Sequence, residues 1–149
     1  MPRIHVVFAL GLLLAACGEA ADVQTTPLPT GTVCPPGGTP LRWADLDLEF
    51  FGSADGATGY CNYCHHTSRV TNADRHGAPP DIRLDDLAVI RAQRVRIDAA
   101  AGKGPTPTTP VMPFILPAPL PPDVPDPQPT PLDAERTALS VWLACGAPE

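Results

Sequence analysis

The sequence lacks the features that mark several large classes of protein. It has no block of basic residues, and its net charge is −6, so nucleic acid is not expected as a partner. No apolar run after the first 16 residues approaches the ~18 needed for a transmembrane helix, so the mature chain is expected to span no bilayer. No segment alternates like a β-strand, and no internal repeat occurs. These absences favour a small all-α domain.

Proline is abundant but unevenly placed. The chain has 21 prolines, twelve of them between Pro105 and Pro131. Such density excludes regular helix, so the loop 104–131 is expected to run over the surface in extended or polyproline segments. Residues 17–40, rich in Thr, Pro and Gly, are expected to be a flexible tether. The folded domain is therefore assigned to residues 41–149, and a core that small often needs a disulfide, metal or cofactor.

The first residues have the pattern of an export signal. Arg3 is followed by the apolar run 6–14 and then by small residues. The stretch LLAAC, residues 13–17, resembles the lipobox of bacterial lipoproteins. This resemblance implies that residues 1–16 are removed, that Cys17 is lipidated, and that the protein is anchored to a membrane facing the periplasm. No Asp follows Cys17, which favours the outer membrane. The alternative is a simple secreted protein.

A first helix is expected from Arg42 to about Cys61. Trp43, Leu46 and Phe50 fall on one helical face, whereas several glycines weaken the second half of this segment.

Two further helices carry recognisable ends. Asp85 is the expected N-cap of a helix that runs to about Ala101, with Gly102 as its stop. Thr130 is the expected N-cap of the last helix, followed by proline at the first helical position, and Gly146 closes that helix.

Five cysteines need partners or roles. Cys34 and Cys145 bracket the domain, and in an oxidising compartment a disulfide between them is expected. It would close a loop of about 110 residues and contribute roughly 4–5 kcal/mol on the chain-entropy model. The alternatives are free thiols or an intermolecular bond.

The stretch CNYCH, residues 61–65, fits the C-x-x-C-H pattern of c-type haem attachment. Two thiols three residues apart on a helical turn can each bond to one haem vinyl group. His65, the next residue, can then offer a ring nitrogen to the iron.

The wider segment Arg42–Cys145 resembles a class I cytochrome c domain. The resemblance rests on four features in the expected order. Aromatic residues precede the attachment motif (Phe50, Phe51 and Tyr60), and a proline-bearing loop GAPPD follows it (77–81). A Met-Pro lies further on in VMPF (111–114), and the last helix carries an aromatic, Trp142. It implies an all-α, cytochrome c-like fold with one covalent haem c.

The resemblance also implies a second iron ligand and a supported proximal histidine. Met112 follows His65 by 47 positions in the sequence and is the expected distal ligand; such His/Met ligation raises the reduction potential. His76 is the alternative distal ligand. In the family a proline orders a carbonyl that accepts the proximal His N–H, and either Pro79 or Pro80 could do so here.

The leading hypothesis is a membrane-tethered monohaem electron carrier rather than an enzyme. Its acidic surface suggests docking to basic patches on redox partner proteins. Three alternatives remain open. The first is a zinc site of Cys61, Cys64 and two of His65, His66 and His76. The second is a haem sensor or enzyme with an open iron position. The third is a non-haem surface lipoprotein in which Cys61 and Cys64 pair.

Overall fold

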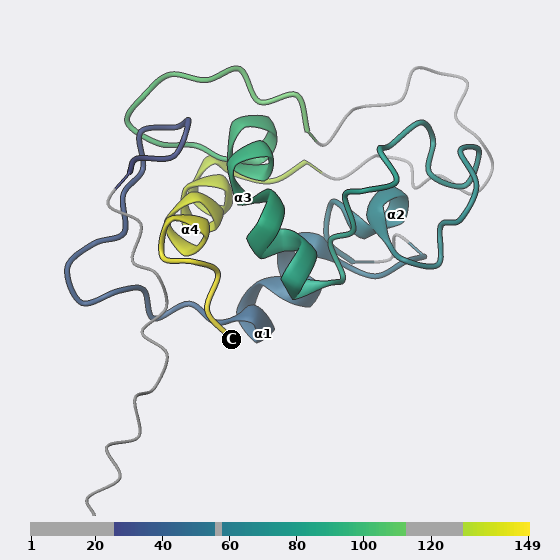
Figure 1. Ribbon diagram of the computed structural model, residues 1–149, viewed down its shortest axis with the longest axis horizontal. Coiled ribbons are helices and arrows are strands. Elements are labelled where there is room, and N and C mark those ends of the chain that lie inside the picture. The colour runs from purple at the N-terminus through teal and green to yellow at the C-terminus, as the bar shows by residue number, and fades with distance from the viewer. Residues whose placement is uncertain (1–25, 56–57, 113–129) are drawn as a thin grey trace, which may run out of the picture.

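The computed structural model describes residues 26–55, 58–112 and 130–149 (Figure 1). The helices α3 and α4 lie side by side, α1 lies next to the C-terminus, and the chain around α2 forms a loop-rich side. The described ranges contain helices and no strand, which confirms the all-α expectation at that level. The elements in chain order are α1 Trp43–Leu46, the π-helix η1 Asp47–Phe51, α2 Asn62–His65, α3 Leu87–Ala101 and α4 Asp133–Ala144.

Some expectations fall outside these ranges. The signal 1–16 and Cys17 lie outside the described residues, as do positions 113–129 of the Pro-rich loop. Among the described helices, none combines the length and the apolar character that a membrane span requires.

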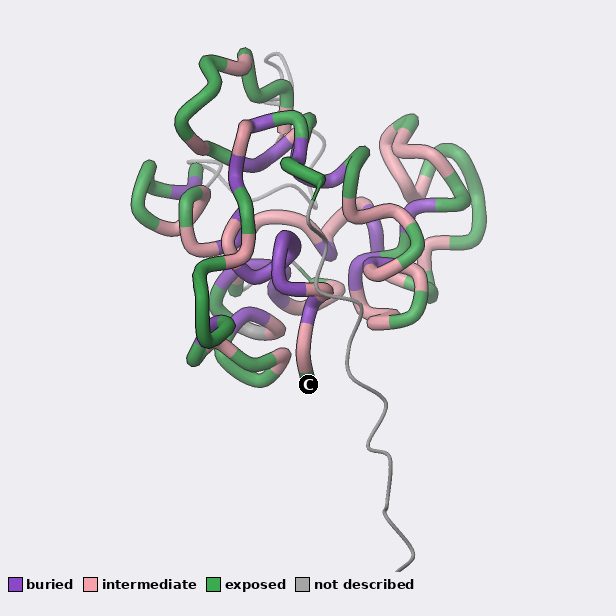
Figure 2. Tube along the Cα trace, turned by 60° about the vertical axis from the view of Figure 1, so that its left-hand side comes forward, coloured by how far each residue is buried: buried purple, intermediate pink, exposed green. Residues whose placement is uncertain are grey.

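The core combines side chains of α1, η1, α3 and α4 with others from the loops. Leu139, Trp142 and Leu143 are fully buried, and buried residues gather in the middle of the molecule (Figure 2). The Trp43 ring stacks on Trp142 with centroids 6.0 Å apart, and Phe51 lies 6.1 Å from Trp142. The first and last helical segments therefore meet through aromatic side chains, which bury large apolar surfaces.

The first helical segment is shorter than the sequence suggested. It ends at Phe51 instead of continuing towards Cys61, because Gly52 adopts φ 83°. A Cβ at this position would collide with the carbonyl oxygen of Thr58. Gly52 therefore turns the chain back on itself, which only glycine does without strain here.

Helix α3 begins one residue later than expected. The N-cap is Asp86, whose Oδ1 accepts hydrogen bonds from the amides of Ala88 at 2.9 Å and Val89 at 3.3 Å. The carboxylate of Asp85, the expected cap, instead accepts hydrogen bonds from the amide and the hydroxyl of Thr67. The helix does stop at Gly102.

Gly102 ends α3 for a packing reason. Its φ of −76° is open to any residue. A Cβ there would collide with Ser140 Oγ and Asp98 Oδ1, so glycine permits the close approach of α3 to α4.

Helix α4 also begins later than expected. Leu132, not Thr130, is its N-cap, and the Leu132 amide donates to Glu135 Oε2 at 2.5 Å. At the other end Gly146 adopts φ 83° and donates to Leu143 O at 3.0 Å, which confirms Gly146 as the closing residue.

The segment assigned to a flexible tether belongs in part to the folded domain. Leu28 and Thr30 are buried. The Thr30 amide and hydroxyl donate to the buried carboxylate of Asp98 at 2.9 and 3.0 Å, and Ser140 Oγ donates to the same carboxylate at 2.6 Å. The boundary at residue 40 is therefore wrong, because a carboxylate on α3 binds the chain near residue 30.

The expected disulfide between Cys34 and Cys145 is present and spans 111 positions. It ties the N-terminal segment to the end of α4.

Candidate functional site

The CNYCH stretch, residues 61–65, forms a single helical turn, which we call the attachment turn. The amides of Cys64 and His65 both donate to the carbonyl of Cys61 at 3.1 Å. Cys61 and Cys64 are free thiols, so the disulfide of the non-haem alternative is not formed. Both thiols and the following imidazole thus share one short turn, as the attachment pattern requires.

This turn is fixed to the core by backbone contacts. The amides of Tyr60 and Cys61 donate to the carbonyls of Phe50 at 2.8 Å and Phe51 at 3.0 Å. The buried Asn62 side chain donates to Gly52 O at 2.7 Å. The reversal at Gly52 therefore brings the attachment turn against the end of η1.

His65 is oriented by a backbone carbonyl. Its side chain is 8 % exposed, and Nδ1 lies 3.1 Å from the carbonyl oxygen of Ile82. The carbonyl can only accept, so Nδ1 carries the proton and Nε2 keeps its lone pair. Burial lowers the pKa of His65, and the hydrogen bond to Ile82 opposes that shift. The ring is therefore held neutral, the form that binds a metal.

The carbonyl that supports His65 is not that of a proline. Pro79 or Pro80 was expected to order such a carbonyl rather than to provide it, and Pro79 O accepts the Ile82 amide at 3.3 Å. The proline pair shapes a turn, and this turn presents the carbonyl of Ile82 to the imidazole.

The two thiols are protonated at neutral pH. Burial raises the pKa of Cys61 to about 12, with the Arg136 guanidinium opposing the shift. Burial likewise raises the pKa of Cys64, and Arg69 opposes it. Redox-active C-x-x-C pairs instead have a depressed thiol pKa. The raised pKa values of Cys61 and Cys64 are therefore opposite in direction to those of redox-active pairs.

Both ring nitrogens of His66 lie close to side chains outside the attachment turn. Its Nδ1 lies 2.9 Å from Ser68 Oγ, and its Nε2 lies 3.3 Å from Asp85 Oδ2. Across the described ranges, no three His, Cys, Asp or Glu side chains group as a metal site would need. The geometry therefore gives the zinc alternative no support.

His76 lies against the attachment turn. Its ring stacks on Tyr63 with centroids 5.1 Å apart and an interplanar angle of 14°. The Arg69 guanidinium lies 4.9 Å from the centroid of the same Tyr63 ring. The imidazole of His76 is thus engaged by the side chain between the two cysteines.

Met112 is held through its backbone. The Met112 amide donates to Ala100 O at 2.9 Å, and its carbonyl accepts from Arg136 at 2.7 Å. Its side chain is partly buried against the core cluster, as is Cys61. The rest of VMPF, Pro113 and Phe114, lies outside the described residues.

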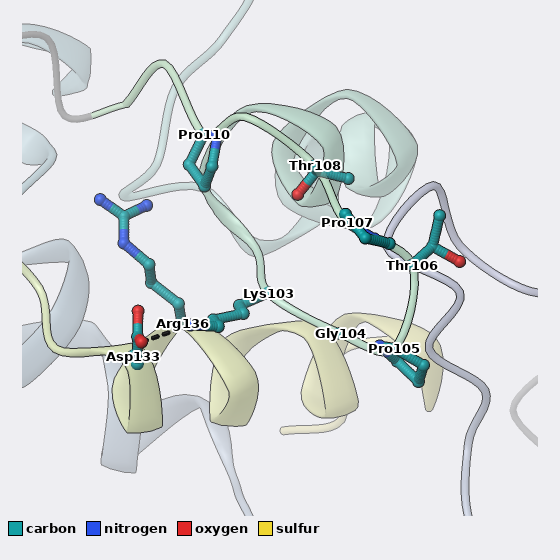
Figure 3. Close-up of a pocket in the computed structure, with 9 residues that line it drawn as sticks. All are labelled: Lys103, Gly104, Pro105, Thr106, Pro107, Thr108, Pro110, Asp133 and Arg136. Atoms are coloured by element: carbon teal, nitrogen blue, oxygen red, sulfur yellow. Dashed lines mark hydrogen bonds and ion pairs between the residues drawn. The ribbon is translucent and has the colours of Figure 1, made fainter.

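A cavity of about 490 Å³ opens between the Pro-rich loop and the start of α4 (Figure 3). Its wall includes Lys103, which pairs with Asp133, and Arg136. Cys61, Cys64 and His65 are not among its lining residues, so this cavity is separate from the attachment turn.

Sequence reasoning missed several residues around the turn. Ile82 acts through a carbonyl, which every residue type has, so no sequence signal could identify it. Glu135 and Arg136 were visible only as charges on the last helix. Their contacts depend on how α4 packs.

In comparisons with known proteins, no family model, curated protein or solved structure matches this chain.

Proposed function

We propose that the protein is an exported monohaem electron carrier of the cytochrome c type. The observation that carries the proposal is the attachment turn. Two free, protonated thiols stand on one helical turn with a neutral imidazole whose Nδ1 is bonded to the Ile82 carbonyl. A backbone acceptor on the second ring nitrogen is the usual support of a histidine that ligates a metal.

The donor set fits a c-type haem. Cys61 and Cys64 would form the thioether bonds, and Nε2 of His65 would be the proximal ligand. Met112 is the proposed distal ligand, and His76 is the less favoured one because its ring stacks on Tyr63. When bound, the haem would supply an iron that alternates between ferrous and ferric states. The chain would supply the iron ligands and a binding site from which water is partly excluded.

The proposed location is a membrane surface outside the cytoplasm. The Cys34–Cys145 disulfide fits an oxidising compartment, and the LLAAC stretch supports a lipid anchor on Cys17. A net charge of −6 supports docking to basic patches on redox partner proteins. One partner would give a single electron, and another would accept it.

Covalent haem is the decisive test. The full chain would be expressed in a bacterium that matures c-type cytochromes, and haem would be stained on a denaturing gel. Wild type is expected to carry one haem, and the Cys61→Ala/Cys64→Ala variant none, because no thioether can form. Cys34→Ser/Cys145→Ser is the matched control, since it removes two cysteines and leaves the attachment pair.

His65→Ala and His66→Ala separate the two adjacent histidines. We expect His65→Ala to lose the native low-spin spectrum and His66→Ala to keep it, because His66 is held by Ser68 and Asp85. Wild-type protein without covalent haem would refute the proposal. Haem with an open sixth position, shown by carbon monoxide binding to the folded protein, would favour a sensor or enzyme.

A further inference from the structure

The C-terminal end of α3 gathers two distant segments. The last carbonyls of a helix have no partner within the helix. Here the amides of Val111 and Met112 both donate to Ala100 O at 2.9 Å. The Pro-rich loop therefore folds back and caps α3 with the backbone of the proposed distal ligand.

Arg136 of α4 completes this contact. Its Nη1 donates to Ala101 O at 2.8 Å and to Met112 O at 2.7 Å. Figure 3 shows the Arg136 side chain rising from α4 beside the loop that carries Pro110. A guanidinium at a helix C-terminus is also favoured by the helix dipole, and α3 has no basic residue in its own last turn. Both peptide groups of Met112 are thus hydrogen-bonded, one to α3 and one to Arg136.

The residue next to Arg136 on α4, Glu135, contacts the residue that precedes the attachment turn. The Tyr60 hydroxyl lies 3.1 and 3.0 Å from the two carboxylate oxygens of Glu135. Tyr60 directly precedes Cys61, and the charge of Arg136 acts on the Cys61 thiol. Two consecutive residues of α4 therefore contact the two segments that would bind the haem: Glu135 contacts Tyr60, next to Cys61, and Arg136 contacts Met112.

We infer that Arg136 is a positioning residue that holds the Met112 backbone so that its thioether sulfur reaches the haem iron. The inference rests on the proposed function and deepens it. Arg136 touches neither thiols nor imidazole in any described hydrogen bond, so it acts through Met112. An arginine suits this task because its charge is permanent and its donors are fixed in a plane.

Arg136→Ala tests the inference in the haem-loaded full chain. The ferric protein is expected to lose most of the far-red sulfur-to-iron absorption, and the ferrous protein to bind carbon monoxide. Amide exchange at Val111 and Met112, whose amides donate to Ala100 O, is expected to accelerate about tenfold or more, because loss of the charged hydrogen bond to the Met112 carbonyl lets this segment open more easily. Arg136→Lys keeps the charge and is expected to restore part of both signals.

Arg94→Ala is the matched control, because it removes one guanidinium from α3 and changes the net charge by the same amount as Arg136→Ala. It is expected to leave the absorption and the exchange unchanged. Far-ultraviolet circular dichroism checks the fold of each variant, and if Arg136→Ala does not fold, the Lys variant decides by the same two measurements.

The outcomes separate this inference from the proposed function. Covalent haem with wild-type absorption and exchange in the folded Arg136 variants would overturn the positioning role alone. Wild type with haem but without a sulfur ligand would also overturn it, while haem attachment stands. Wild type without haem would overturn both.

Discussion

At the scale of single residues, the Tyr60–Glu135 pair is expected to make the folded protein less stable at alkaline pH. Burial raises the pKa of Tyr60 first of all, and the hydrogen bond and charge of Glu135 raise it further. Because the folded-state pKa lies above the unfolded value, the stability this group contributes is present below the unfolded pKa. It is lost as the pH rises through the folded pKa.

Tyr60→Phe is expected to flatten that loss. Above about pH 10, the ordinary pKa of tyrosine, the urea midpoint of wild type should fall more steeply than that of Tyr60→Phe. Glu135→Gln is the comparison, because it removes the charge that raises the pKa of Tyr60 and keeps an acceptor for its hydroxyl, so its fall should lie between those of wild type and Tyr60→Phe. Equal slopes for wild type and Tyr60→Phe would contradict the assignment.

The site residues differ in how visible they are from sequence. Cys61, Cys64 and His65 could be singled out because the C-x-x-C-H pattern specifies both residue types and spacing. The groups that hold His65, Tyr60 and Met112 in place could not be singled out in this way. The Ile82 carbonyl, the Glu135 carboxylate and the Arg136 guanidinium take their roles from tertiary packing, which local patterns do not encode.

At the scale of elements, the cap of α3 can be assigned by substitution. Asp86→Ala should destabilise the protein by about 1 kcal/mol, because two first-turn amides lose their acceptor. Asp86→Ser should recover most of the loss, since serine is also a good N-cap. The measurement is denaturant unfolding together with amide exchange at Ala88 and Val89.

Asp85→Ala is the comparison that discriminates between the two aspartates. Asp85 binds Thr67 and His66, so its loss should loosen the segment after the attachment turn. It should leave exchange at Ala88 and Val89 unchanged. Faster exchange there in Asp85→Ala than in Asp86→Ala would show that the caps are assigned in the wrong order.

Helix ends were the least predictable feature of the elements. Asp85 and Asp86 are equally good caps by type, and the contact with Thr67 occupies the first of them. Thr130 and Pro131 had the right types for a helix start, yet α4 begins at Asp133, because the Glu135 carboxylate takes the Leu132 amide. The existence of both helices followed from their apolar spacing, whereas their starts followed from contacts made elsewhere.

At the scale of the whole molecule, the N-terminal segment is joined to the helices by long-range contacts. Thr30 and Asp98 are 68 positions apart, and Cys34 and Cys145 are 111 apart. Composition predicted a tether for residues 17–40, since Thr, Pro and Gly are typical of linkers. The buried carboxylate of Asp98 reverses that outcome, because it needs donors and Thr30 provides two of them. The disulfide was predictable by counting cysteines, whereas this hydrogen-bond network was not.

The disulfide should account for a large part of the stability of the folded chain. Closing a loop of this length lowers the entropy of the unfolded state, which raises the free energy of unfolding by about 4–5 kcal/mol on the chain-entropy model. Cys34→Ser/Cys145→Ser is therefore expected to lose nearly that much in urea unfolding. Its m-value is expected to rise, because the unlinked unfolded chain exposes more surface.

The control is a pair of single variants, each of which breaks the same bridge. Cys34→Ser and Cys145→Ser should each lose as much stability as the double variant, since the cross-link is absent in all three. Helix content should be retained, because α3 and α4 also meet through Asp98 and Ser140. A loss below about 1 kcal/mol in all three variants would mean that the contacts around Asp98 persist in the unfolded chain and already restrict it.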